Sequence, residues 1–309
     1  MNLLQPYLIS LASMDIIQLV LNGLSVGSIL ALAAVGLTLT YGILRLSNFA
    51  HGDYMTLGAY VTWLCNSFGL NIWLSMVVGA FGTIGGMLIA EKLLWQPMRD
   101  KRATSTTLII ISIGLALFIR SGVLFIWGSG NQQYDLPVVK AINLTEMFGL
   151  PEAFGDIRIA YYRVVVMVMT LLVILGLHFV LQNSKIGKAM RAVADNIDLA
   201  RVSGVDVERV VLWTWVITGS LTAIAGSMYG LITTVRPNMG WFLILPMFAS
   251  VILGGIGNPY GAIAGAFVIG VAQEVSVAFL GPDYKLGVAL LIMVALLFIR
   301  PQGLFKGTM

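Results

Sequence analysis

The chain has 309 residues, of which 58% are hydrophobic and only 10% are Asp, Glu, Lys or Arg. A typical soluble domain carries roughly 25% charged residues, so this chain could not cover a water-exposed surface. The composition excludes an intrinsically disordered chain and a nucleic-acid-binding domain. A disulfide scaffold is excluded because Cys65 is the single cysteine. Lipid is therefore the expected solvent for most of the chain.

Nine apolar stretches are candidates for membrane-crossing helices, each of which needs about 20 mostly apolar residues. No Lys or Arg precedes the first stretch and no small-residue cleavage site follows it, so we expect a retained helix rather than a cleaved signal. The second stretch is polar and the seventh is short, so either could be a broken or re-entrant segment. We predict an all-α polytopic bundle of eight to nine segments in a single domain, residues 1–309. The stretches are 16–40, 47–67, 72–94, 107–127, 162–181, 211–234, 241–256, 259–280 and 284–299.

The basic residues predict which ends of these segments share one side of the membrane. Four connections on one side of an alternating nine-segment path hold twelve of the 18 Lys and Arg residues. By the positive-inside rule this side is the cytoplasm, so the N-terminus is expected outside, the C-terminus inside, and residues 128–161 form an external loop. The twelve are Arg45, Lys92, Arg99, Lys101, Arg102, Lys185, Lys188, Arg191, Arg201, Arg209, Arg300 and Lys306, and the acidic residues of the external loop are Asp135, Glu146, Glu152 and Asp156.

The cytoplasmic loop 183–210 contains an amphipathic pattern. From Ile186 to Val202 the small and apolar residues recur at three- and four-residue steps, which is typical of an amphipathic helix. The pair Ser203 and Gly204 then interrupts the pattern. Such a helix could dock into a groove of another protein, or it could be a solvated surface helix.

Motifs for catalysis by the chain itself are missing from the sequence. It has no Gly-x-x-x-x-Gly-Lys-[Ser/Thr] phosphate loop, no His-Glu-x-x-His zinc motif and no Gly-x-Ser-x-Gly nucleophile elbow. The two histidines, His51 and His178, lie on separate segments. We therefore expect no enzyme activity, no catalytic residues, no metal ligands and no cofactor bound by this chain, so uphill transport would need an ion gradient or another subunit.

Charged residues inside the apolar stretches are candidates for function because they are costly in lipid. Asp53 lies near the start of the second stretch, Arg120 in the outer half of the fourth, and Glu274 near the middle of the eighth. The alternative for each is a structural ion pair or hydrogen bond, and Arg120 could also snorkel outward.

Three sequence stretches resemble one family. They are Ser-Asn-Phe-Ala-His-Gly-Asp-Tyr-Met-Thr-Leu-Gly-Ala-Tyr at 47–60, Lys-Ala-Met-Arg-Ala-Val-Ala-Asp-Asn at 188–196, and Val-Ile-Leu-Gly-Gly-Ile-Gly-Asn-Pro-Tyr-Gly-Ala at 251–262. They resemble the permease subunits of branched-chain amino acid ABC importers, and the tail Arg-Pro-Gln-Gly-Leu-Phe at 300–305 is similar to that family's ending.

The resemblance implies a bacterial inner-membrane importer. Two related permease subunits would form the pore, two ATPase subunits would use ATP and Mg²⁺ on the cytoplasmic face, and an external binding protein would deliver an amino acid. Residues 183–210 would contact the ATPase, because residues 198–204 match the Glu-Ala-Ala-x-x-x-Gly pattern of importer permeases, with Asp198 for Glu and Leu199 for the first Ala. The coupling residues implied are Lys188, Arg191, Asp195, Asp198, Ala200 and Gly204, and the candidate translocation path is Asn48, His51, Gly52, Asp53, Gly254, Gly255, Gly257, Asn258 and Glu274.

Two other functions stay open from the sequence. Urea and other small-solute importers have similar permeases, and cargo specificity in such systems rests largely with the binding protein. A proton- or sodium-coupled secondary transporter would use Asp53 or Glu274 as the ion carrier. Uptake by this chain alone, without ATPase subunits, would favour the secondary transporter.

Overall fold

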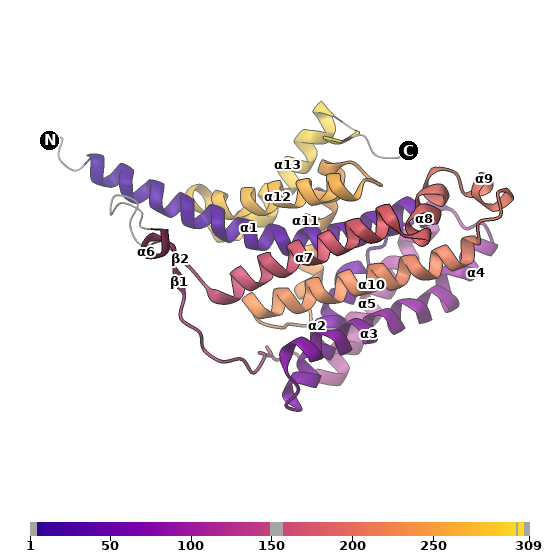
Figure 1. The fold of residues 1–309 in the computed structure, drawn as a ribbon, viewed down its shortest axis with the longest axis horizontal. Coiled ribbons are helices and arrows are strands. Elements are labelled where there is room, and N and C mark those ends of the chain that lie inside the picture. Colours follow the sequence, from indigo (N-terminus) through magenta and orange to yellow (C-terminus); the bar gives the residue numbers. More distant parts are fainter. Residues whose placement is uncertain (1–4, 149–156, 301, 306–309) are drawn as a thin grey trace.

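Helices make up nearly all of the regular structure in the computed structural model, which describes residues 5–148, 157–300 and 302–305. The nine predicted segments all correspond to helices (Figure 1). They are α1 (Gln5–Leu44), α2 (His51–Ser67), α3 (Ile72–Ala90), α5 (Ser105–Trp127), α7 (Tyr161–Asn183), α10 (Val207–Ile232), α11 (Met239–Gly254), α12 (Pro259–Leu280) and α13 (Lys285–Ile299). The predicted all-α polytopic bundle is confirmed.

Short elements connect these helices. A π-helical turn, Glu91–Trp95, and α4 (Gln96–Asp100) extend α3 without a break. The loop between α5 and α7 holds α6 (Leu144–Phe148) and an antiparallel strand pair, β1 (Ile142–Asn143) and β2 (Arg158–Ile159), in which Ile142 faces Ile159. The remaining elements are α8 (Lys185–Asp195), α9 (Ile197–Val202) and the 3₁₀ turn Pro282–Tyr284.

The prediction that the second and seventh segments are the weakest is confirmed. Within the described residues, seven stretches are helical, apolar and at least 18 residues long. The two remaining segments are α2, with 17 residues, and α11, with 16. Each belongs to a crossing that is helical in one half only.

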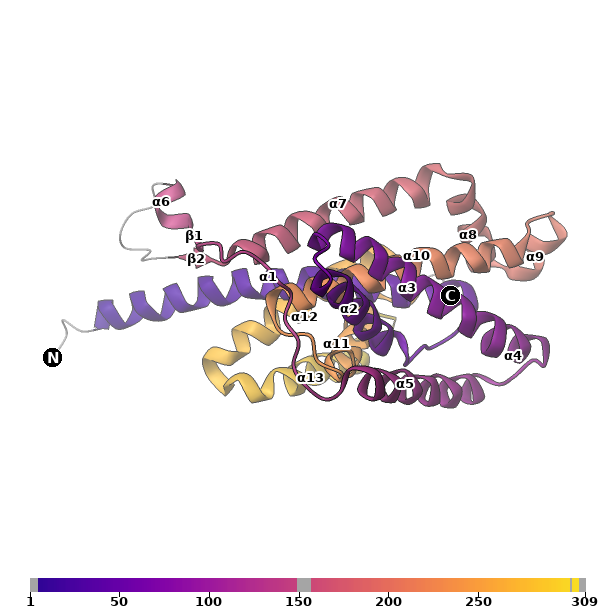
Figure 2. The same cartoon turned by 90° about the horizontal axis from the view of Figure 1, so that it is seen from below.

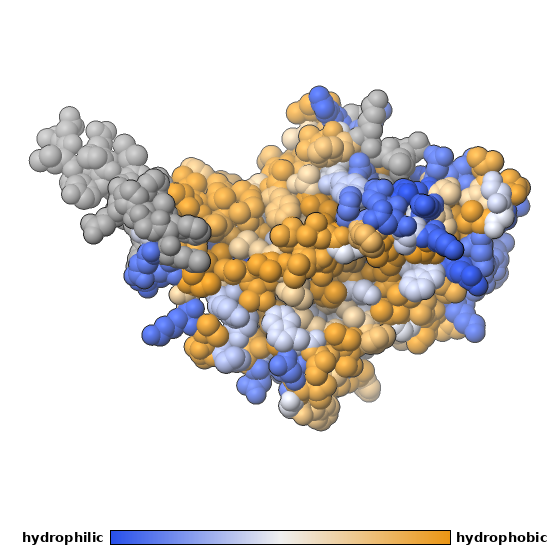
Figure 3. Space-filling view, in the orientation of Figure 1, coloured by the Kyte–Doolittle hydropathy of each residue, from blue (hydrophilic) through white to orange (hydrophobic). Residues whose placement is uncertain are grey.

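The molecule has two polar ends separated by an apolar belt. We call the end that carries α4, α8 and α9 the basic end, and the opposite end, with residues 128–148 and 157–160, the loop end (Figures 1 and 2). Figure 3 shows apolar side chains over the middle of the visible face and hydrophilic ones gathered toward the ends. Three of the predicted basic stretches share the basic end, because one cavity there is lined by Arg45, Lys92 and Arg201. Glu152, Asp156 and Lys306 lie outside the described residues.

The second crossing is extended in its basic half and helical in its loop half. The helix α1 ends at Leu44, and Arg45 has a positive φ of 53°. The segment 45–50 then runs along α5, where the Ser112 hydroxyl donates to Ser47 O and accepts from Phe49 N. The helix α2 begins at His51, and its Tyr54 hydroxyl donates to the carbonyl of Gly86, the midpoint of the helical stretch Ile72–Asp100. This crossing is therefore helical only from mid-depth to the loop end.

The seventh crossing has the opposite arrangement. After α10, Val235 exchanges two backbone hydrogen bonds with Gln132 at the loop end. The helix α11 begins at mid-depth, where Gly240 N donates to the Thr56 hydroxyl of α2. It ends at Gly254, whose carbonyl accepts from Phe305 N. The two half-length helices thus meet by their N-terminal ends near the middle of the bundle.

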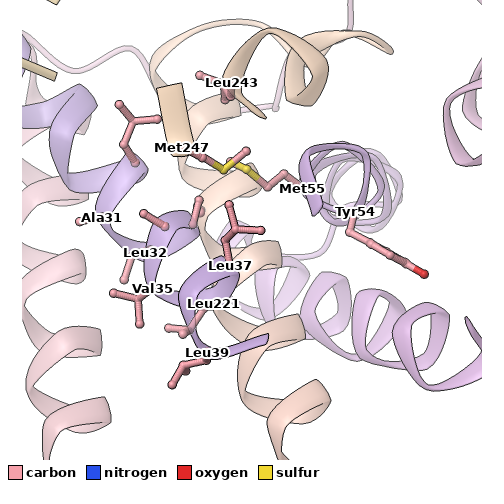
Figure 4. Packing of buried hydrophobic residues seen from close by; sticks show 14 of the residues in the cluster. Ala31, Leu32, Val35, Leu37, Leu39, Tyr54, Met55, Leu221, Leu243 and Met247 are labelled. Carbon is pink, nitrogen blue, oxygen red and sulfur yellow. The ribbon is translucent and has the colours of Figure 1, made fainter. Parts of the chain in front are cut away.

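The helix order forms an inverted repeat. The series α1, α2, α3, α5 and the series α10, α11, α12, α13 cross the bundle in opposite directions, and α7 lies between them in the chain. In this repeat α1 corresponds to α10, α2 to α11 and α3 to α12, and corresponding helices make corresponding contacts. The packing of α1 on α12 matches that of α10 on α3, and the packing of α2 on α10 matches that of α11 on α1. Figure 4 shows the centre of this packing, where Met55 of α2 and Met247 of α11 point toward one another and Tyr54 points away.

Close packing of glycine backbones holds the two half-helices together. A Cβ built on Gly240 would lie 1.7 Å from the carbonyl oxygen of Gly52. A Cβ on Gly52 would lie 2.3 Å from the carbonyl oxygen of Gly240. Small residues allow this approach in a membrane bundle, where lipid provides no hydrophobic drive for association.

We predict that Gly240→Ala destabilises the protein by about 1–3 kcal/mol, as overpacking of a filled core does. The measurement is thermal unfolding of the purified protein in detergent. Gly85→Ala is the matched control, because nothing lies within 4 Å of a Cβ at Gly85 in α3. An unchanged melting temperature for Gly240→Ala would contradict the backbone contact.

Candidate functional site

The first turn of α2 brings buried polar groups to mid-depth. Asn48, His51 and Asp53 are all fully buried. His51 lies between α1 and α10, where its Nε2 is 2.9 Å from Ala33 O and 3.3 Å from the Thr222 hydroxyl. Since a carbonyl only accepts, Nε2 carries the proton and Nδ1 is an acceptor. Neither His51 Nδ1 nor Asn48 Nδ2 makes a hydrogen bond to any residue that the structure describes. The site therefore has one acceptor, His51 Nδ1, and one donor, the Asn48 Nδ2 amide, that no described residue pairs with.

Asp53 and Arg120 form an ion pair inside the apolar belt. Arg120 Nε donates to Asp53 Oδ1 over 3.0 Å, and Nη2 donates to Oδ2 over 3.1 Å. The guanidinium carbon lies 4.3 Å from the ring centre of Trp241 in α11. Three crossings thus contribute to this group, because Asp53 lies on α2, Arg120 on α5 and Trp241 on α11. The bidentate pairing shows that Arg120 reaches into the bundle and does not snorkel outward.

The glycine stretch 254–258 lies apart from the α2 site. It forms the turn between α11 and α12 at the basic end, with positive φ at Gly255 and Gly257. The Asn258 side chain accepts from the backbone N–H groups of Tyr260 and Gly261 and so caps α12. Gly254 packs against the backbone of Gly261. The structure therefore separates Gly254, Gly255, Gly257 and Asn258 from Asn48, His51, Gly52 and Asp53.

Glu274 also lies apart, in the loop half of α12. Its carboxylate accepts from Lys285 Nζ over 2.6 Å. The sequence suggested a position near the middle of this segment. In α12, Glu274 is six residues from the C-terminal end of the helix. Of the candidate path residues, those between Asn48 and Asp53 are together, whereas the turn and Glu274 occupy the two opposite ends.

The predicted amphipathic helix of residues 186–202 is two helices. Asn196 has an extended conformation, and its side chain caps α9 by accepting from the N–H groups of Asp198 and Leu199. Of the residues in the predicted pattern, Val193 and Ala200 are buried, whereas Ala192 and Ile197 are exposed. The single helix was wrong because an Asn that caps the following turn competes with helix continuation.

The predicted coupling residues cover the outer surface of the basic end. Lys188, Arg191, Asp195 and Asp198 are exposed, whereas Ala200 is buried. The Arg191 guanidinium donates to the carbonyl of Leu181 in the last turn of α7. Gly204 has φ of +84° and open space around it. The turn at Gly204 leads into α10, so α9 and α10 are connected by four residues of backbone, 203–206.

A cavity of about 780 Å³ lies beneath α8 and α9 at the basic end. Its wall includes Glu91, whose carboxylate accepts from the Arg99 guanidinium and, over 2.7 Å, from the indole Nε1 of Trp215. Glu91 follows α3 in the π-helical turn and is buried. The sequence did not predict the interaction of Glu91 with Trp215, because Trp215 lies in another helix. The one sequence feature that marks Glu91 is an acidic residue at the end of an apolar stretch.

At the loop end, Tyr134 anchors the segment between α5 and β1. Its hydroxyl donates to the carbonyl of Ala59 in α2, and its ring packs against Gly230 of α10. Burial raises the pKa of the Tyr134 phenol, which therefore stays neutral as a donor. Among the residues that the structure describes, no group of three His, Cys, Asp or Glu side chains could hold a metal ion.

A polytopic bundle with half-length helices and charged groups at mid-depth is typical of membrane transport proteins. The model of the family "Branched-chain amino acid transport system / permease component" matches residues 19–297. The chain therefore belongs to this family of permease components, and it is a multi-pass protein of the inner membrane. It is a permease subunit of an ABC importer.

Curated relatives agree with this family. Over 298 residues the chain is 30% identical to the high-affinity branched-chain amino acid transport system permease protein LivH of Salmonella typhimurium, which covers 93% of this chain and 94% of LivH. BraD of Pseudomonas aeruginosa, a permease protein of the same description, is 28% identical over 93% of this chain and 95% of BraD. LivM of Escherichia coli is 24% identical over 98% of this chain and 72% of LivM. No solved structure matches the chain significantly.

We predict that Glu91→Ala lowers the free energy of unfolding by about 1–3 kcal/mol, because it leaves the buried Trp215 N–H without an acceptor. Thermal unfolding of the purified protein measures the loss. In a double-mutant cycle, Trp215→Phe should cost less in the Glu91→Ala background than in the wild type. Strict additivity of the two losses would contradict a direct interaction between Glu91 and Trp215.

Proposed function

We propose that the chain is one of two related permease subunits in an ATP-driven importer of branched-chain amino acids. The observation that carries the cargo class is similarity over almost the full length to LivH and BraD, both described as branched-chain amino acid permeases. Similarity to LivM supports a second, related permease as the partner, since LivH and LivM of Escherichia coli are permease proteins of the same transport system. Two ATPase subunits and an external binding protein complete the proposed assembly.

The ion pairs support ATP coupling over an ion gradient. A proton or sodium carrier needs a carboxylate that can bind and release its ion. Asp53 is bonded to Arg120 and Glu274 to Lys285. Each candidate carboxylate already has a cationic partner, so neither is suited to carry an ion. Coupling then falls to the exposed helices at the basic end.

The test is uptake by the reconstituted assembly. Proteoliposomes that hold this chain, the second permease, both ATPases and the binding protein should accumulate radiolabelled leucine when ATP is enclosed with the ATPases. Unlabelled isoleucine and valine should compete with leucine, whereas urea should not. Leucine uptake by this chain alone, driven by a sodium or proton gradient, would overturn the proposal.

We place the basic end in the cytoplasm because the positive-inside rule assigns Lys- and Arg-rich connections to that side. In a Cys65→Ser background, Val138→Cys should react with a membrane-impermeant maleimide in intact spheroplasts, because Val138 is fully exposed at the loop end. Val202→Cys, 81% exposed in α9, should react only after the membrane is permeabilised. Labelling of Val202→Cys in sealed cells would reverse the orientation.

We assign α9 as the ATPase contact because it exposes apolar side chains in a polar setting. Leu199 and Val202 are 60% and 81% exposed and share one face of the helix. Val202→Glu should abolish copurification of the ATPase subunits with a tagged permease and lower leucine uptake to background, since it places a charge in an apolar contact. Val138→Glu, the same change at the loop end, is the control and should keep the ATPases bound. Retention of the ATPases by Val202→Glu would refute the contact.

A further inference from the structure

The ion pair of Asp53 and Arg120 has one closed side and one open side. The Asp53 side chain is fully buried, whereas the Arg120 side chain is 16% exposed. Trp241, which covers one face of the guanidinium, is 37% exposed. The bundle therefore encloses the anion completely, whereas the cation, which reaches inward to Asp53, keeps one side open.

Arg120 holds its charge in the middle of the membrane. Its helix continues for seven residues to Trp127, about 10 Å toward the loop end. The guanidinium instead bonds to the first turn of α2, from which the helix runs about 21 Å to Ser67 at that end. A partly exposed guanidinium at this depth is strongly disfavoured in hydrocarbon. The open side of Arg120 is therefore expected to border a water-filled path or another protein chain and not lipid.

The open side offers donors for a carboxylate. A guanidinium has five N–H groups, and Asp53 takes one from Nε and one from Nη2. Arg120 Nη1 makes no hydrogen bond to any residue that the structure describes. Because paired donors on a guanidinium match the two oxygens of a carboxylate, this edge suits a carboxylate ligand.

The surface next to these donors is apolar. Trp241, Phe242 and Leu245 lie on one exposed side of α11, and Phe242 and Leu245 are 56% and 36% exposed. Trp241 touches the guanidinium, so the apolar surface begins where the donors end. A ligand with a carboxylate beside a branched apolar group would contact both parts.

We propose that Arg120 and Trp241 form a substrate-contact site on the translocation path, with Arg120 binding the carboxylate of an apolar amino acid and Trp241 contacting its side chain. Asp53 is a positioning residue, because it fixes the guanidinium and partly neutralises its charge. This neutralisation keeps substrate affinity low enough for release. The inference depends on the proposed function, since it needs an importer of apolar amino acids.

Direct binding tests the ligand chemistry. The wild-type assembly in nanodiscs, without binding protein, is examined by saturation-transfer NMR with leucine, 4-methylpentanoate and leucinamide. Leucine and 4-methylpentanoate, which carry the carboxylate, should show saturation transfer, and leucinamide should not. Equal signals from leucinamide and leucine would overturn carboxylate recognition.

Variants connect this binding to transport. Asp53→Asn combined with Arg120→Gln replaces the ion pair by two amides of similar shape. It should lower the amount of leucine imported per ATP hydrolysed about tenfold, as loss of charge-assisted hydrogen bonds does. Asp206→Asn combined with Arg209→Gln, which neutralises an exposed pair at the basic end, is the control. The proposal would be overturned if the Asp53 and Arg120 variant imported as much leucine per ATP hydrolysed as the wild type.

Two further variants distinguish a substrate contact from a purely structural role. Trp241→Leu leaves the ion pair in place and should weaken the leucine signal in NMR, whereas Trp213→Leu, at an exposed Trp of α10, should not. If the double amide variant does not assemble with the second permease, Arg120→Lys decides the question, because it retains the charge but loses the paired guanidinium donors. An assembled Arg120→Lys that binds and imports leucine as the wild type does would assign Arg120 to the subunit contact and overturn the site. Wild-type liposomes that import no leucine would instead refute the proposed function.

Discussion

The structure depends on one constraint, which is that backbone polar groups inside the membrane need partners within the protein. Two crossings leave the helical conformation for half of their length, and each extended half is paired locally. The segment 45–50 bonds to Ser112, and Val235 bonds to Gln132. The ends of both breaks converge at mid-depth, where Gly52 and Gly240 touch. The polar site lies there because the breaks expose helix starts there, surrounded by protein and not by lipid.

The sequence predicted the number of segments and the two ends because lipid enforces both. Apolar length follows membrane thickness, and basic connections follow sidedness. It also identified 47–67 as a weak crossing, since Asn48, His51 and Asp53 are costly in a lipid-facing helix, and 241–256 as a weak one because it is short. The depth and direction of each break were not predictable. They depend on the contact between Gly52 and Gly240, and no local pattern in either segment specifies a partner so distant in sequence.

For the candidate site, too, the sequence predicted single residues but not their three-dimensional contacts. Asp53 and Arg120 each stood out as an intramembrane charge, but which face of α5 meets α2 is a tertiary property, so their pairing emerged only in three dimensions. Glu274 paired with Lys285, which lies at the start of the next predicted segment, 284–299. The glycines at 52 and 254–257 have similar sequence surroundings and different roles. Gly52 permits a backbone contact, whereas Gly255 and Gly257 supply the positive φ of a turn.

The helix α10 connects the basic end to the mid-depth site. It begins two residues after Val205, next to the Gly204 turn of α9, and at its centre Thr218 and Thr222 contact the region of His51. It also packs along α2 and α3, and Trp215 fixes it to Glu91. Packed helices shift as bodies and do not deform continuously. A displacement of α9 would therefore reach α2 through α10, at the point where α2 and α11 meet through the backbones of Gly52 and Gly240 and the hydrogen bond from Gly240 N to the Thr56 hydroxyl.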